Sequence, residues 1–275
     1  SSQEQTATQE VAAPASGDSN TSPTSNLFPP QEVLNFWFSG EYGNDEVMSS
    51  PEFEAKMLPM WFGVELTPEG PRPISPEMSA AIDKRCLKFV DTIRALGRNE
   101  LVGEEWQTTD GLFAQIILGD QLARNCFRGS AEAYGFAHQT QAAARKIFDS
   151  GAYKQWRALP YFTFLSCVNL HSEDVADHVK NKAIIEFVKE NVDSGAGYER
   201  LQSAVVEHSE VVERFGRYPH RNAQLGREST AEEKAWLADV DNLPSWAKSQ
   251  LAKSEPSKDK SEDKGDSTNS APAAQ

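Results

Sequence analysis

The sequence is short of cysteine, and the cysteines it has lie far apart. Cys86, Cys126 and Cys167 form no CxxC pair, and three is an odd number for a set of disulfides. Disulfide-rich secreted domains and structural zinc sites carry paired cysteines at short spacings. We therefore expect buried free thiols in a protein from a reducing compartment.

Long apolar runs are missing as well. No stretch approaches the roughly 18 apolar residues that a membrane-spanning helix needs. The first residues also lack the basic and apolar regions of a secretory signal. These absences predict a soluble, cytoplasmic protein with no membrane partner, unless a leader that precedes Ser1 directs the chain to an organelle.

Positive charge is scarce: 27 lysines and arginines stand against 41 acidic residues, which gives a formal net charge of −14. A chain this acidic repels the phosphates of nucleic acids, so no nucleic-acid partner is expected. The arginines do gather in two places, at Arg124 and Arg128 and again within 214–227. A local anion site is therefore compatible with an acidic protein.

The motifs of the common cofactors do not occur. The chain has no HExxH or Cys/His pattern for a metal, and no GxGxxG or GxxxxGK[ST] loop for a nucleotide. It also has no GxSxG nucleophile elbow. We expect neither a metal nor an organic cofactor.

Large apolar residues are rare at both ends of the chain. Residues 1–26 are mostly Ser, Thr, Gln, Ala and Pro, and residues 249–275 are mostly Lys, Ser, Glu and Asp. Such segments bury too little apolar surface to offset the loss of chain entropy, so both are predicted to be disordered tails. The segment between them, 27–248, is long enough for one domain with a sizeable core.

What this central segment does have is helical periodicity. Apolar residues recur at spacings of three and four, and no stretch alternates for the length of a strand, so the domain is predicted to be all-α. The segment 63–74, rich in Pro and Gly, is expected to be a loop. Helices of similar length with short joins predict antiparallel helical hairpins stacked in a tetratricopeptide-like array, although no 34-residue repeat occurs. The expected helices cover 31–38, 51–62, 75–96, 109–125, 131–149, 155–170, 173–190, 198–215 and a last one that opens at Thr230.

Two charged residues continue an apolar stripe in the helix expected at 109–125. Counting on from Phe113, Ile116 and Ile117 by helical spacings leads to Asp120 and Arg124, four residues apart on one face. Buried charges need a partner. Two interpretations stay open: an internal pair that joins helices, or a cavity wall in which Asp120 is a base or orients one while Arg124 binds an anion.

Histidines lie on apolar stripes in two further helices. His208 falls in the middle of the stripe of 201–215, and the positions of Phe164 and Val168 direct His171 towards the core. Each can be a hydrogen-bonded core histidine or an acid/base group of a site. Glu173 follows His171 and suits the positive end of the next helix.

A dense polar segment follows Gly216. Within 217–222 it has two arginines, a histidine and an asparagine, and Pro219 suits the first position of a short helix. The free N–H groups of such a helix start favour anions. The alternative is a tight turn whose polar side chains cap the backbone.

Several of these motifs, taken together and in this order, resemble the family called domain of unknown function 924. The resemblance covers about residues 31–240 and implies an all-α, tetratricopeptide-like fold with no established activity. Two segments depart from the family pattern: Leu122-Ala123 replaces Phe-Pro, and 167–170 replaces a Pro-Leu-Met type of sequence. The motifs are 33–38, 61–63, 120–125 with 128–129, 171–174, and 214–222 with 225–230.

Two functions remain open. In the first, a buried polar pocket binds a small anionic molecule through a carboxylate or phosphate and performs acid/base hydrolysis. His208 or His171 would act as the base, oriented by Asp120 or Glu173. The ligand-binding side chains would be Trp37, Trp61, Arg124, Asn125, Arg217, His220, Arg221 and Asn222.

In the second, the chain is a non-catalytic, tetratricopeptide-like module that binds a protein or peptide. The polar motifs would then be buried networks that fix helix packing. The first function requires the predicted side chains to converge on one site, whereas the second allows them to be scattered. The sequence specifies no oligomeric state.

Overall fold

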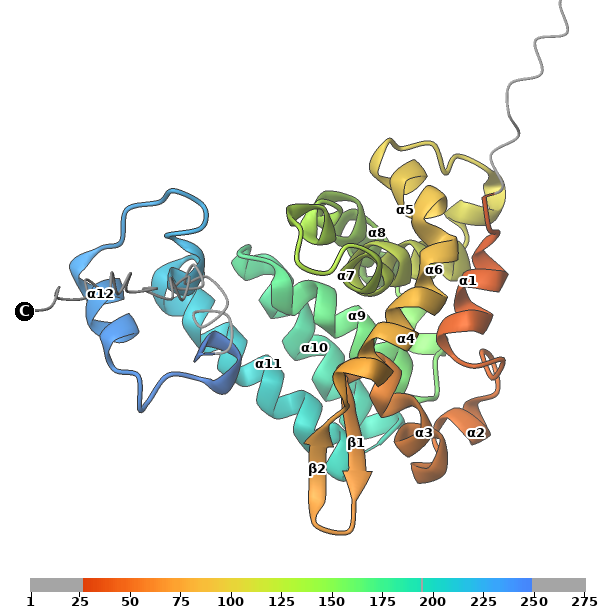
Figure 1. Cartoon of the computed structure of the whole chain (residues 1–275), viewed down its shortest axis with the longest axis horizontal. Helices are drawn as coiled ribbons and strands as arrows, with labels where there is room; N and C mark the ends of the chain where they lie inside the picture. The colour runs from red at the N-terminus through yellow and green to blue at the C-terminus, as the bar shows by residue number, and fades with distance from the viewer. Residues whose placement is uncertain (1–26, 194, 249–275) are drawn as a thin grey trace, which may run out of the picture.

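The computed structural model describes residues 27–193 and 195–248, so the two predicted tails lie outside the described residues. The described part is an all-α domain, as predicted (Figure 1). Within it, no helix is long and apolar enough to cross a membrane. The helices are α1 (Pro30–Trp37), α2 (Asp45–Met48), α3 (Pro51–Phe62), α4 (Pro76–Cys86), α5 (Val90–Gly97), α6 (Thr109–Ile116), α7 (Ala123–Cys126), α8 (Ala137–Asp149), α9 (Leu159–His171), α10 (Val175–Asn191), α11 (Ala196–Phe215) and α12 (Ala231–Ala238).

The prediction of a loop over 63–74 was wrong. This segment contains an antiparallel hairpin of β1 (Val64–Thr67) and β2 (Gly70–Pro73), which extends away from the helices in Figure 1. Both strands of a two-stranded sheet are edge strands, where proline is tolerated because its missing N–H faces solvent. The prolines that suggested a loop are therefore compatible with β2.

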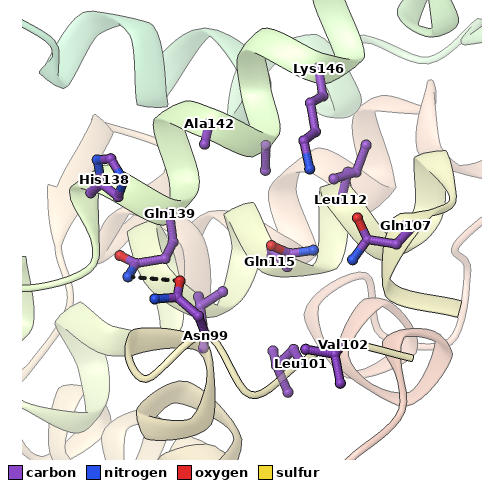
Figure 2. A pocket seen from close by; sticks show the side chains of 12 residues that line it. Asn99, Leu101, Val102, Gln107, Leu112, Gln115, His138, Gln139, Ala142 and Lys146 are labelled. Atoms are coloured by element: carbon purple, nitrogen blue, oxygen red, sulfur yellow. Dashed lines mark hydrogen bonds between the residues drawn. The ribbon is translucent and has the colours of Figure 1, made fainter. Parts of the chain in front are cut away.

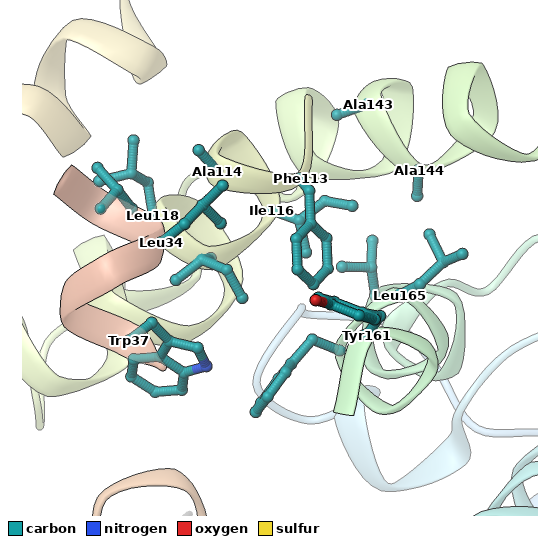
Figure 3. Close-up of a cluster of buried hydrophobic side chains, with 14 of the residues drawn as sticks. Leu34, Trp37, Phe113, Ala114, Ile116, Leu118, Ala143, Ala144, Tyr161 and Leu165 are labelled. Atoms are coloured by element: carbon teal, nitrogen blue, oxygen red, sulfur yellow. The ribbon is translucent and has the colours of Figure 1, made fainter. Parts of the chain in front are cut away.

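An aromatic core joins α1, α3, α6 and α9. Figure 3 shows the part of it that contains Trp37, Phe113 and Tyr161. The ring of Phe38 lies 5.7 Å from Trp61 and 5.9 Å from Phe164, measured between centroids. The Trp61 Nε1 donates to the Trp37 carbonyl at 3.0 Å. Burial of rings this large contributes much of the stability of a helical domain.

Helices α9, α10 and α11 follow one another in sequence and pack together (Figure 1). Buried polar side chains connect the first two. Asn169 on α9 donates to Asn181 on α10 at 3.0 Å, and Asn181 donates to the Ser166 carbonyl at 3.1 Å. Such matched groups avoid the cost of burying an unpaired amide. The wider tetratricopeptide-like arrangement stays a prediction.

A second, smaller apolar cluster lies at the C-terminal end of α11. Val211, Val212 and Tyr218 form its buried part, and Phe215 and Trp236 pack against it. Helix α12 begins after Thr230, as predicted, and a capping box stabilises its start: Thr230 accepts from the Glu233 N–H at 3.1 Å, and Glu233 accepts from the Thr230 N–H at 2.8 Å. This end of the molecule carries most of the polar residues selected from the sequence.

Candidate functional site

Asp120 lies in a π-helical segment, Ile117–Leu122, inserted between α6 and α7. Wide turns of this kind are rare and often occur at functional sites. The carboxylate is 5% exposed, and Arg124 donates to it at 3.3 Å and to the Asp120 carbonyl at 2.7 Å. Gln121 donates to the other carboxylate oxygen at 2.7 Å. The predicted pair on one face of the helix is therefore present.

His171, the last residue of α9, contacts both members of this pair. Its Nδ1 lies 2.8 Å from Asp120 Oδ1 and 3.0 Å from Arg124 Nη2. An ionised Asp120 can only accept a hydrogen bond, and Arg124 can only donate one. Nδ1 can therefore form a hydrogen bond with only one of the two residues at a time. When it carries a proton, it donates to Asp120; when it does not, it accepts from Arg124. The imidazole side chain is 33% exposed, so it can meet a ligand.

The charge state of Asp120 follows from these contacts. Burial by itself raises the pKa of the Asp120 carboxyl, but His171 and Arg124 outweigh burial and hold this pKa far below its usual range. Asp120 is therefore a carboxylate at neutral pH. A buried carboxylate on Nδ1 fixes the orientation of the imidazole.

Arg221 approaches the same histidine from the turn Pro219–Arg221 that follows α11. Its Nη1 donates to the His171 carbonyl at 3.0 Å, and its guanidinium lies 4.5 Å from the centre of the Tyr218 ring. No carboxylate of the described residues forms an ion pair with it. Burial lowers the pKa of Arg221. The nearby Tyr218 and Glu173 oppose this effect, whereas the charges of Arg124 and Arg227 reinforce it.

The carboxylate of Glu173 occupies the anion site that the sequence predicts at the start of that turn. Its carboxylate accepts from the Tyr218 N–H at 2.8 Å and from Arg227 at 2.6 and 2.9 Å. Hydrogen bonds to Arg227 and Tyr218 lower the pKa of Glu173 against the opposing effect of burial. Glu173 therefore neutralises Arg227, and no hydrogen bond joins it to His171 or His208 among the described residues.

Arg217 and Asn222 belong to a different cluster, around Glu233 of α12. Arg217 donates to the two carboxylate oxygens of Glu233 at 2.7 and 2.8 Å, and Asn222 donates to one of them at 3.1 Å. The hydrogen bonds from Arg217 lower the pKa of Glu233 to about 2. The carboxylate matches the guanidinium completely in charge and geometry.

His208 lies at the edge of the α11 stripe, and Ser209 occupies its centre. Ser209 is fully buried and lies 3.3 Å from Nδ1 of His178, whereas His208 is partly exposed. Nδ1 of His208 donates to the Ala204 carbonyl at 2.7 Å, and its ring stacks on Trp246 at 4.1 Å. Burial lowers the pKa of His208 to about 4. Because this pKa lies well below 7, His208 is a neutral packing residue at physiological pH.

The remaining predicted residues lie elsewhere. Asn125 donates to Asp83 at 2.9 Å, beside the bidentate pair of Arg128 with Asp83. Trp37 and Trp61 are part of the aromatic core and are 1% and 8% exposed. His220 is buried against Tyr218, with the two ring centres 5.3 Å apart.

The structure thus brings together four of the predicted side chains, those of Asp120, Arg124, His171 and Arg221, which we call the open cluster. The other predicted side chains lie outside this cluster.

Sequence reasoning assigned no role to several neighbours of the open cluster. The Arg124 guanidinium lies 5.0 Å from the centre of the Tyr134 ring, and this ring is 61% exposed. Cys167 lies one helical turn before His171 on α9, and burial raises the pKa of its thiol to about 12, so it is not a thiolate. A single exposed tyrosine gives no signal in a sequence, whereas the spacing of Cys167 and His171 could have been noticed.

Neither of two cavities found among the described residues is lined by a predicted site residue. One, of about 270 Å³, lies between α6 and α8 (Figure 2), and one of about 210 Å³ lies beside Leu27 and Trp106. In the described segments, no group of three His, Cys, Asp or Glu side chains is placed to hold a metal ion. The open cluster is therefore a partly exposed set of charges rather than an enclosed pocket.

Comparisons with other proteins agree with the resemblance. A family model described as "Bacterial protein of unknown function (DUF924)" matches residues 33–241. A solved structure of a protein of unknown function from Agrobacterium tumefaciens is 31% identical over 57% of this chain and 84% of that chain, with a TM-score of 0.43. A comparison with curated proteins found no match.

Proposed function

The chain belongs to the DUF924 family of bacterial proteins of unknown function, and from this premise we propose that the open cluster binds a small anion through a carboxylate or phosphate. The observation that carries the proposal is the charge of Arg221, which has no carboxylate partner among the described residues. Arg124 is matched by Asp120, and Arg227 is matched by Glu173. One cation is therefore left over, in a protein whose net charge is −14.

The free donors of the two arginines support this proposal. Arg221 uses Nη1 alone for a hydrogen bond to a described residue, and Arg124 uses Nε and Nη2. The remaining N–H groups can bind an oxyanion, and the planar fork of arginine suits carboxylates and phosphates. A second anion next to Asp120 is tolerated because Arg124 and His171 already contact the Asp120 carboxylate.

His171 would supply acid/base chemistry to the bound anion. The contact of Nδ1 with Asp120 leaves Nε2 on the opposite side of the ring, with no hydrogen bond to a described residue. In hydrolysis, Nε2 would take a proton from an attacking water and then give it to the leaving group. Asp120 would stabilise the imidazolium between these two steps.

The alternative is a non-catalytic, tetratricopeptide-like module that binds a peptide. Its support is that Arg217, Asn222 and Asn125 are all engaged with carboxylates of the chain. Such networks fix the packing of helices and need no ligand. The alternative gives no reason for the unmatched charge of Arg221.

Thermal unfolding in a panel of small carboxylates and phosphates tests the proposal. A ligand at 100 times its Kd stabilises by about 2.7 kcal/mol, which raises Tm by roughly 5–10 °C in a domain of this size. We expect such a shift for at least one anion, and its loss in Arg221→Gln. Arg214→Gln, which removes an exposed arginine from the same region, is the matched control and should keep the shift.

The acid/base role needs a separate measurement. An ester or phosphate panel with a chromogenic leaving group reports hydrolysis, and His171→Gln should abolish turnover while the anion-induced Tm shift persists. If no anion shifts Tm, or if Arg221→Gln keeps the full shift, anion binding at the open cluster is wrong. If His171→Gln hydrolyses as fast as the unaltered protein, binding stands and the catalytic role does not.

A further inference from the structure

The cavity of about 270 Å³ is a second candidate site and shares no residue with the open cluster. One wall is a single face of α8, formed by His138, Gln139, Ala142 and Lys146 (Figure 2). These positions recur at helical spacings, so their side chains line up along the helix. The cavity is therefore elongated along α8.

A cation lies at one end of this cavity. Figure 2 shows the Lys146 side chain reaching into the hollow towards Gln115, with Leu112 and Gln107 beside it. Lys146 forms no ion pair with any described residue, although acidic side chains outnumber basic ones in the chain. Its ammonium and the Gln107 amide can together accept a carboxylate.

An unmatched acceptor lies towards the other end. Gln139 donates from Nε2 to the Gly97 carbonyl at 3.2 Å, and its Oε1 is buried with no hydrogen-bond partner among the described residues. A buried acceptor without a donor costs about 1–3 kcal/mol, so a ligand that offers an N–H here would recover this energy.

Between the two ends the cavity combines amides with aliphatic side chains. Gln115 donates to the Trp106 carbonyl at 2.8 Å, which fixes its amide and leaves Oε1 as an acceptor. Leu101 and Leu112 line the same stretch, and Val102 is 77% exposed at its rim. Fixed amide acceptors beside aliphatic surface suit a chain of peptide groups with small apolar side chains.

The length of the cavity sets the size of the ligand. Gln139 and Lys146 are seven residues apart on a helix, which is roughly 10 Å along its axis. An extended peptide advances about 3.3 Å per residue, so about three residues cover this span. We propose that the cavity binds an extended peptide of about three residues, with its C-terminal carboxylate at Lys146 and an N–H at Gln139 Oε1.

Saturation-transfer NMR with the full chain tests this inference. The probes are a mixture of tripeptides with free carboxylates and the same mixture with C-terminal amides. We expect transfer to the free acids and about tenfold weaker binding of the amides, since a hydrogen bond to a charged group contributes about 1.5–3 kcal/mol. Lys146→Gln should weaken the free acids by about the same factor, whereas Lys84→Gln, which alters an exposed lysine on α4, should not.

Further variants and probes complete the test. Gln139→Leu should weaken binding several-fold. The loss caused by Lys146→Gln should be the same with and without Arg221→Gln, because Arg221 lies outside the cavity. Such a ligand could be the C-terminal tail of another protein or a free oligopeptide, and decapeptides that end in the selected three residues separate these two sources. Binding equal to that of the tripeptide indicates a protein tail, and weaker binding indicates a free oligopeptide. Both results agree with the inference. No transfer from any tripeptide, equal binding of acids and amides, or undiminished binding to Lys146→Gln would overturn it.

Discussion

Two arginine clusters lie near the C-terminal end of α11, and they differ in charge balance. In the cluster around Glu233, Arg217 is matched by a buried carboxylate through two hydrogen bonds. In the open cluster, Arg221 donates to a backbone carbonyl and has no carboxylate partner among the described residues. Both arginines come from one stretch of six residues. The difference teaches that the same residue type, within one short motif, reaches a different charge balance once the chain is folded.

The largest change in stability is expected from a substitution in the cluster around Glu233. Glu233→Ala removes the partner of Arg217 and half of the capping box of α12. We expect a loss of about 2–3 kcal/mol in the free energy of unfolding, measured by urea denaturation. Glu232→Ala, at the preceding position, removes an exposed ion pair with Arg214 and should change the free energy of unfolding by less than about 0.5 kcal/mol. Equal effects of the two substitutions would contradict a special role for Glu233.

The second-largest effect is a pH dependence of the unfolding free energy, caused by Glu233 in the same cluster. The pKa of Glu233 is about 2 in the folded protein and close to its ordinary value of 4.5 when unfolded. Between these values the unfolded state binds more protons, so the stabilisation is present above about pH 4.5 and is lost as pH falls towards 2. The difference in unfolding free energy between the unaltered protein and Glu233→Gln should stay constant from pH 7 to 5 and shrink below pH 4.5. A difference that does not change with pH would show that Glu233 carries no shifted pKa.

Opposite signs are expected for two substitutions of arginine by methionine. Arg217→Met leaves the Glu233 carboxylate without its cation and should destabilise the protein. Arg221→Met removes a partly buried cation that no carboxylate matches, so the free energy of unfolding should stay the same or rise by up to about 1 kcal/mol. Urea denaturation without added anions measures both. Destabilisation by Arg221→Met as large as that by Arg217→Met would mean that the two clusters are equivalent structural networks.

The smallest effect concerns the exposed ring beside Arg124. Tyr134→Ala removes a cation–π contact worth about 0.5–1 kcal/mol at an exposed site. We expect Tm without ligand to fall by about 1–4 °C, and a two- to fivefold weaker affinity for the anion found in the Tm panel. Tyr153→Phe is the control, because it keeps an aromatic ring and Tyr153 is not part of the open cluster. It should leave the affinity for the anion unchanged. Unaltered affinity in Tyr134→Ala would show that the ring does not position Arg124.

Local features of the chain were predicted well. The all-α class, the helix starts at 75 and at Thr230, and the placement of Asp120 and Arg124 on one helix face are all present in the structure. Each depends on residues no more than four positions apart, so helical spacing is enough to predict it. The hairpin at 63–74 was missed because proline on an edge strand and proline in a loop look the same in a sequence.

The proximity of the candidate residues to one another was predicted in part. Asp120, Arg124, His171 and Arg221 do converge, but His208 packs on Trp246, and Arg217 and Asn222 bind Glu233. These partners lie 11 to 38 positions away or on other elements, so no periodicity connects them. A single helical rotation of about 100° also separates His208 from Ser209, and packing against α10 decided which of the two is buried.

The sequence by itself determined the helices, their caps and the scarcity of positive charge, because these depend on neighbouring residues and on composition. The tertiary structure alone decided which arginine meets a carboxylate. Electrostatic attraction depends on distance in space and on exclusion of water, and folding brought Glu233 to Arg217 and Glu173 to Arg227 while it placed Arg221 against the carbonyl of His171.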